Sequence, residues 1–119
     1  MDNKQFARQL EERTLNFAVR IIGLSSKLPN TSEGWVVRNQ LTKAGTSVGA
    51  NYREANRSRS KPEFKSKIKV CESEASETNY WLTIVRLMEW LTSEETEWEF
   101  NESKELLSIF SSIGKKLTS

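Results

Sequence analysis

The stretch Phe64–Val85, FKSKIKVCESEASETNYWLTIV, contains the pattern that decides the fold. Seven residues, six of them apolar, recur in it at alternating steps of four and three: Phe64, Ile68, Cys71, Ala75, Thr78, Leu82 and Val85. This spacing puts the side chains on one face of an α-helix. A second stripe occupies another face of the same segment: Val70, Trp81, Ile84, Met88 and Leu91. Two stripes need two neighbours, so residues 61–91 are predicted to form a central helix.

Three further segments have helical periodicity, over about residues 3–28, 32–56 and 93–117. Pro29 ends the first of them. Capping boxes are predicted at Ser60–Glu63 and Thr92–Glu95, where the third and fourth helices begin. The sequence has no strand pattern and its connections are short. We therefore predict an all-α protein, an antiparallel up-down four-helix bundle that forms one domain of residues 1–119.

Composition restricts the class of protein and of site. The chain has no histidine and one cysteine, Cys71, which is expected to be a small core residue. Two carboxylates without histidine are a weak metal signature, so we expect no metal, no cofactor and no catalytic residues. No apolar run approaches the roughly 20 residues that cross a bilayer. The start, Met1–Gln5, has no signal-peptide core, and a cytoplasmic protein is expected.

The charge is segregated along the chain. Between Arg38 and Lys69 there are nine Lys and Arg against two Glu, a net charge of +7 in a chain whose total is +2. From Glu72 to Ser119 ten Glu stand against four bases, a net charge of −6. A concentrated cationic surface attracts polyanions or an acidic protein. Binding is therefore the first functional expectation.

The bases of the middle block are spaced to form ridges. Lys61, Lys65 and Lys69 recur every four residues, Arg53 and Arg57 do the same, and the chain turns between the two sets. Such a ridge is either a solvated helix face or a phosphate-binding surface. The sequence contains no zinc finger, KH loop or aromatic RNP pattern. The candidate nucleic-acid-binding residues are Arg53, Arg57, Arg59, Lys61, Lys65, Lys67 and Lys69.

Polar residues interrupt the apolar seams. Ser47, Asn51 and Glu54 lie on one face of the second helix and are expected to hydrogen-bond to another helix. Glu74 and Glu77 are expected to pair with one of three arginines, which are Arg13, Arg20 and Arg53.

Further expectations concern packing. Gly45 and Gly49 weaken a helix, so a second helix is expected to approach them closely. Phe64 is predicted to be buried, with Phe64→Ala costing roughly 3–5 kcal/mol. The acids that open the fourth helix are interpreted as a solvated first turn: Glu94, Glu95, Glu97 and Glu99.

Three stretches resemble a known family: Ala44–Ala55 (AGTSVGANYREA), Arg57–Phe64 (RSRSKPEF) and Cys71–Leu82 (CESEASETNYWL). They are similar to the bacterial four-helix-bundle proteins encoded in 23S ribosomal RNA intervening sequences. The resemblance implies a homopentameric ring. Members of the family that the chain resembles include relatives of the accessory variability protein of diversity-generating retroelements, which is basic and associates with nucleic acid and a reverse transcriptase. The family-typical positions are Ser47, Asn51, Glu54, Ser60, Glu63, Phe64 and Glu77.

Three function classes follow. The first is a non-enzymatic oligomeric protein whose basic corner binds RNA or RNA–DNA phosphates by charge and shape. The second is a homo-oligomeric scaffold that docks an acidic partner, such as a reverse transcriptase or the Glu-rich fourth helix of a neighbouring copy. The third is an enzyme. Helical ribonucleases of the HEPN type need an arginine and a histidine, and a chain without histidine cannot supply that pair.

Overall fold

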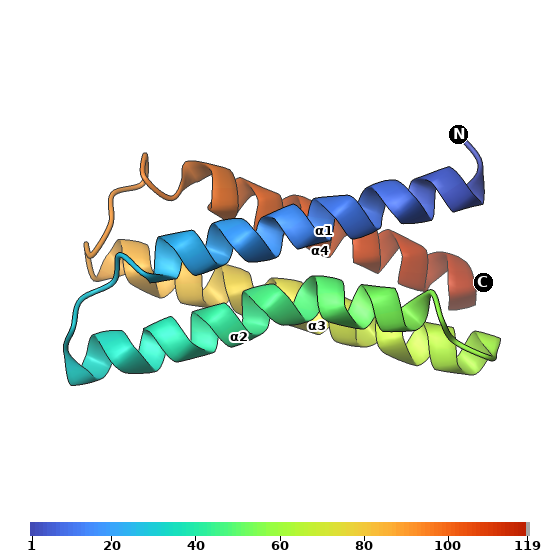
Figure 1. The fold of residues 1–119 in the computed structure, drawn as a ribbon, viewed down its shortest axis with the longest axis horizontal. Coiled ribbons are helices and arrows are strands. Elements are labelled where there is room, and N and C mark those ends of the chain that lie inside the picture. The colour runs from blue at the N-terminus through green and yellow to red at the C-terminus, as the bar shows by residue number, and fades with distance from the viewer. Residues whose placement is uncertain (119) are drawn as a thin grey trace.

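The structure is a computed structural model that describes the backbone of residues 1–118 and the side chains of residues 1–117. These residues form four helices: α1 (Asn3–Ser25), α2 (Ser32–Ala55), α3 (Lys61–Leu87) and α4 (Glu97–Thr118). Consecutive helices run antiparallel in a bundle of 44 × 25 × 22 Å (Figure 1). The chain start, the α2–α3 turn and the end of α4 lie at one end of it. The predicted all-α bundle is confirmed.

The helices pack in chain order. α1 contacts α2, α2 contacts α3 and α3 contacts α4. α4 also contacts α1, but much less extensively. Within the described residues α1 and α3 stand diagonally, with no close backbone contact between them. None of the helices in residues 1–118 is long and apolar enough to cross a lipid bilayer.

Side chains cap the starts of α1, α2 and α3, and of these caps only Ser60 was predicted. Thr31 Oγ1 accepts the Gly34 amide at 3.0 Å and Ser60 Oγ accepts the Glu63 amide at 3.2 Å, at the starts of α2 and α3. Each cap satisfies an amide that the first helical turn leaves unpaired. The α1 cap, Asp2, was not predicted, and it forms a capping box with Gln5.

Three helix boundaries differ from the predicted ones. α1 ends at Ser25, not Leu28, because the next turn tightens to amide bonds spanning three residues, such as Leu28 N to Ser25 O at 3.1 Å. α3 ends at Leu87, not Leu91. Glu89 adopts a φ of 57°, and Trp90 N donates to Val85 O at 3.2 Å, which is a Schellman end without glycine.

The fourth helix also begins later than predicted, at Glu97. The capping box between Thr92 and Glu95 does form, with both bonds at 2.9 and 3.0 Å. It closes a turn ahead of α4, and the Thr92 amide lowers the pKa of the Glu95 carboxyl.

The first α3 seam is the centre of the core. Six of its seven members are buried, and Phe64 is half-buried at the end of the bundle, so its predicted full burial is wrong. The second stripe is covered only in part. Leu91 is buried, Trp81 and Ile84 are partly buried against the core, and Val70 and Met88 are exposed. α3 does contact two neighbours, α2 and α4.

Close packing of α1 on α2 explains two glycines. A Cβ added at Gly45 would lie 2.6 Å from Ile21 Cγ2, and one added at Gly49 would lie 2.9 Å from Thr14 Oγ1. Real Cβ contacts do not come this close, so only glycine lets the helices approach. The expected close approach is confirmed.

Candidate nucleic-acid interface

The basic corner comprises Arg53, Arg57, Arg59, Lys61, Lys65, Lys67 and Lys69. It surrounds the turn between α2 and α3, at one end of the bundle (Figure 1). The turn is held by its own residues, since Glu63 Oε2 accepts the Arg59 amide at 3.4 Å while the Glu63 amide donates to Ser60 Oγ. The predicted capping box is therefore half formed, because the Glu63 carboxylate bonds Arg59 and not Ser60. Pro62 stands in the first turn of α3.

The basic side chains of the corner are open to solvent. Five of them are exposed, and Lys65 and Lys67 are half-buried. Arg53 has a loose ion pair with Glu11, with Nε and Oε1 3.9 Å apart. A long pair between solvated groups contributes little, and a phosphate can displace it.

Helical phase divides the lysines of α3 into two sets. Lys61, Lys65 and Lys69 follow one another on a single ridge, as predicted. Lys67 lies two residues out of that phase and one turn before buried Cys71, on a different side of α3. Its charge lowers the pKa of the Cys71 thiol slightly, but burial dominates and raises that pKa to about 12.

The structure adds two lysines that the sequence reasoning missed. Lys116 lines a surface hollow of about 360 Å³ together with Lys61 and Lys65. Lys115 lines the next hollow, of about 220 Å³, with Lys69. The acidic last third of the sequence concealed these residues. The antiparallel order was the available signal, because it places the end of α4 beside the start of α3.

The α4 face near the opposite end of the bundle is acidic. A hollow of about 420 Å³ on α4 is lined by Glu94, Glu97, Trp98, Asn101, Glu102 and Glu105. The charge separation in the sequence thus becomes a separation between a basic corner and an acidic α4 surface.

The predicted interhelical hydrogen bonds of α2 are wrong. Ser47 Oγ donates to Lys43 O at 2.6 Å, and Asn51 Nδ2 donates to Ser47 O at 2.8 Å. Both acceptors belong to α2 itself, because a short side chain reaches the carbonyl one turn back more easily than it reaches a second helix. Glu54 is exposed.

The predicted partners of Glu74 and Glu77 are also wrong. Glu77 Oε2 accepts from Trp81 Nε1 on its own helix at 3.2 Å. Glu74 is half-buried, and burial, followed by the charge of Glu77, raises the pKa of its carboxyl. The three arginines pair elsewhere.

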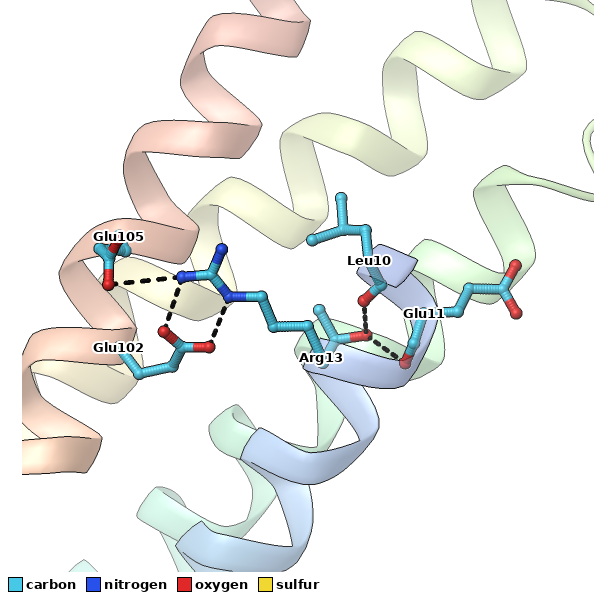
Figure 2. Close-up of polar contacts among 6 residues, drawn as sticks. Leu10, Glu11, Arg13, Glu102 and Glu105 are labelled. Atoms are coloured by element: carbon cyan, nitrogen blue, oxygen red, sulfur yellow. Dashed lines mark hydrogen bonds and ion pairs between the residues drawn. The ribbon is translucent and has the colours of Figure 1, made fainter. Parts of the chain in front are cut away.

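Two of these arginines join α1 to α4. Arg13 makes a bidentate pair with Glu102, with both bonds at 2.7 Å, and reaches Glu105 at 3.4 Å (Figure 2). The bond to Glu102 raises the pKa of the Arg13 guanidinium. Arg20 donates to Glu99 at 3.2 Å. Glu99 is buried, so its interpretation as a solvated first-turn acid is wrong.

The described residues hold no group of three or more His, Cys, Asp or Glu side chains that could bind a metal ion. The geometry of the basic corner is that of a charged surface around a fixed turn.

Comparison with known proteins gives the family. Residues 8–112 match the family model described as 23S rRNA-intervening sequence protein. The chain belongs to this family.

A solved structure supports this assignment. The chain superposes with a TM-score of 0.82 on the crystal structure of a protein with unknown function from the S23 ribosomal protein family of Bacteroides thetaiotaomicron VPI-5482. The two sequences are 38% identical, over 88% of this chain and 97% of that one. A comparison with curated proteins finds no match. The resemblance inferred from the sequence is confirmed.

Proposed function

We propose that this family member is a non-enzymatic, oligomeric nucleic-acid-binding protein whose basic corner contacts RNA or RNA–DNA phosphates. The observation that carries the proposal is the gathering of seven bases, five of them exposed, around one fixed turn. Phosphate contacts of this kind hold a backbone without reading its sequence. The protein would meet such polymers in the cytoplasm.

Oligomer formation is the second part of the proposal. Leu15, Val19 and Ile22 follow one another at steps of four and three on the outside of α1, and they are 59%, 59% and 49% exposed. Val70 on the diagonal helix α3 and Met88 at its C-cap are exposed as well. Two different apolar faces on diagonal helices suit a head-to-tail contact between copies, which closes into a ring when the rotation allows it. The family resemblance suggests five copies, and light scattering should report about five protomers.

A ring would strengthen weak contacts. Each copy would present its basic corner once, so a polymer that reaches several corners would bind with avidity. A stable monomer at micromolar concentration would remove this part of the proposal and leave a single weak corner.

The binding test uses charge-neutralising variants. Replacing Arg53, Arg57, Arg59, Lys65 and Lys69 by Gln or Ser should abolish RNA binding and preserve helicity and oligomer size. Wild-type affinity should fall steeply with salt, with a log-log slope of several units, because each neutralised phosphate releases counterions.

A matched control separates position from total charge. The triple variant Arg53→Gln, Arg57→Gln, Arg59→Gln removes three charges from the corner. The variant Lys27→Gln, Lys43→Gln, Lys104→Gln removes three from elsewhere. The first should weaken RNA binding far more than the second, whereas equal losses would assign the affinity to net charge alone.

The second candidate function is a scaffold for an acidic partner, such as a reverse transcriptase or the α4 surface of a neighbouring copy. The acidic α4 hollow favours it, because that surface complements the basic corner in charge. If the wild type binds neither RNA nor DNA at about 50 mM salt, the nucleic-acid proposal fails and the scaffold takes its place.

A further inference from the structure

Three surface hollows follow one another along the join between α3 and α4. The first two, described above, contain Lys61, Lys65 and Lys69 from α3 opposite Lys115 and Lys116 from α4. The third, of about 680 Å³, shares Lys69 and Glu72 with the second. Its other walls include Ser76, Glu77 and Tyr80 of α3 and Leu107 of α4. We call the three together the α3–α4 groove.

The basic end of the groove has the spacing of a backbone track. Lys61, Lys65 and Lys69 are four residues apart, and four residues of helix rise about 6 Å. This rise is close to the distance between successive phosphates of an extended single strand. The α4 lysines form the opposite wall of the same end.

The far end of the groove contains an exposed aromatic ring. Tyr80 is 59% exposed, although a large apolar ring on a bundle surface is more stable when it is covered. Its ring stands edge-on to Trp81, with the centroids 5.1 Å apart, and Trp81 is itself fixed by its bond to Glu77. The Tyr80 ring thus packs against Trp81 and is largely exposed to solvent. A nucleic-acid base can stack on an exposed aromatic ring of this kind.

Gly114 keeps the middle of the groove open. It lies within α4, where glycine is less favourable than alanine. Unlike Gly45, it has no packing reason, since a Cβ added there would meet nothing within 4 Å. Gly114 lines the second hollow, so any larger side chain would project from the wall of the groove.

The carboxylates of the groove make its two ends chemically different. Glu72 and Glu77 repel phosphate at the Tyr80 end, but a carboxylate accepts hydrogen bonds from the amino groups of bases. The lysine end of the groove therefore suits a nucleic-acid backbone, and the Tyr80 end suits a base. In a duplex the bases are stacked inside and cannot reach Tyr80.

We propose that the α3–α4 groove binds a single-stranded stretch of RNA, with its backbone on the lysine ridge and one base stacked on Tyr80. This inference rests on the proposed function and deepens it, because it names the polymer form and the path that it takes. The arginines of the α2–α3 turn then serve as flanking phosphate contacts.

The test measures fluorescence anisotropy of a labelled single-stranded RNA and of a blunt RNA duplex of equal length, at one salt concentration. Tyr80→Ala should weaken single-strand binding about tenfold, and Tyr80→Phe should restore it, because stacking needs the ring and not the hydroxyl. Gly114→Gln should weaken single-strand binding by blocking the groove. Duplex binding should change less than twofold in all three variants. The matched control is Leu87→Ala, which removes a side chain that is 78% exposed on α3 and does not line the groove.

The outcomes separate the groove from the basic corner. If Tyr80→Ala and Gly114→Gln bind single strands as the wild type does, while the triple variant Arg53→Gln, Arg57→Gln, Arg59→Gln loses binding, the groove is excluded and the proposed function stands. The inference would also be overturned if Tyr80→Ala and Gly114→Gln lost as much affinity for the duplex as for the single strand. It would likewise be overturned if Leu87→Ala lost as much single-strand affinity as they do. If the wild type binds no RNA, both proposals fail. Circular dichroism checks that each variant folds. If Gly114→Gln loses helicity, the comparison of Tyr80→Ala with Tyr80→Phe still tests the groove.

Discussion

Adding one methyl group at Gly45 should destabilise the bundle, although alanine is the better helix residue. The new Cβ would lie 2.6 Å from Ile21 Cγ2 and 2.9 Å from both Cβ and Cγ1 of the same side chain. Ile21 is fully buried and branched at Cβ, so no flexible end can move aside. Overpacking costs about 1–3 kcal/mol, here at the upper end, and helix propensity returns about 1 kcal/mol. We expect Gly45→Ala to lower the free energy of unfolding by about 2 kcal/mol.

Urea denaturation at a fixed protomer concentration measures this loss, since unfolding of an oligomer depends on concentration. Gly23→Ala is the matched control. Gly23 is also helical, but a Cβ there meets nothing within 4 Å, so the substitution should stabilise by about 0.5–1 kcal/mol. The two alanines should therefore act with opposite signs.

A double-mutant cycle identifies the contact responsible. Ile21→Ala removes two of the three crowding atoms, Cγ1 and Cγ2, and leaves Cβ, so Gly45→Ala should cost clearly less in that background than in the wild type. If Gly45→Ala stabilises as much as Gly23→Ala, or costs the same with and without Ile21, the close approach of α1 to α2 is not what requires glycine.

The remaining predictions concern the core phenylalanines, the Cys71 thiol and the ion pair between Arg13 and Glu102. Phe64→Ala should cost about 2 kcal/mol in urea denaturation, clearly less than Phe110→Ala at about 3–5 kcal/mol, because only Phe110 is fully buried. Burial raises the pKa of the Cys71 thiol from 9.0 to about 12, so its contribution to stability is complete below pH 9 and is lost as pH rises from about 9 toward 12. Denaturation midpoints across that range measure the loss, and a thiol reagent at pH 8 should label only unfolded protein. Glu102→Gln, which breaks the buried bidentate pair, should cost about 1–2 kcal/mol, whereas Glu105→Gln, at a 69% exposed side chain, should change stability by less than about 0.5 kcal/mol.

Periodicity predicted the helices but not where they end. Trp90 and Leu91 continue the apolar spacing of α3 and pack against or within the core, so the pattern alone cannot reveal that the helix stops at Leu87. The stop depends on the backbone of Glu89, a residue type that rarely adopts a positive φ. Glycine or proline would have signalled this end, and the sequence has neither there.

Side-chain pairing was the least predictable feature. The bonds of Arg13 and Arg20 depend on which face of α4 meets α1, and helical spacing within one segment does not determine that. The basic corner was predictable because its residues are adjacent in sequence and on both sides of a single turn. Lys115 and Lys116 were not, since they join it only through the antiparallel return of α4.

The first residue of the lysine ridge lies where helix electrostatics disfavour it. The start of a helix carries the positive end of its dipole, which prefers acids such as Glu63 and acts within the first turn, yet α3 begins with Lys61. Lys115 and Lys116 are in the last turn of α4, where the dipole favours bases, so local stability accounts for them. It does not account for Lys61. A base that works against its own helix dipole is what the proposed anionic ligand would require at this end of the ridge, and this argument applies to Lys61 before it applies to the arginines of the turn.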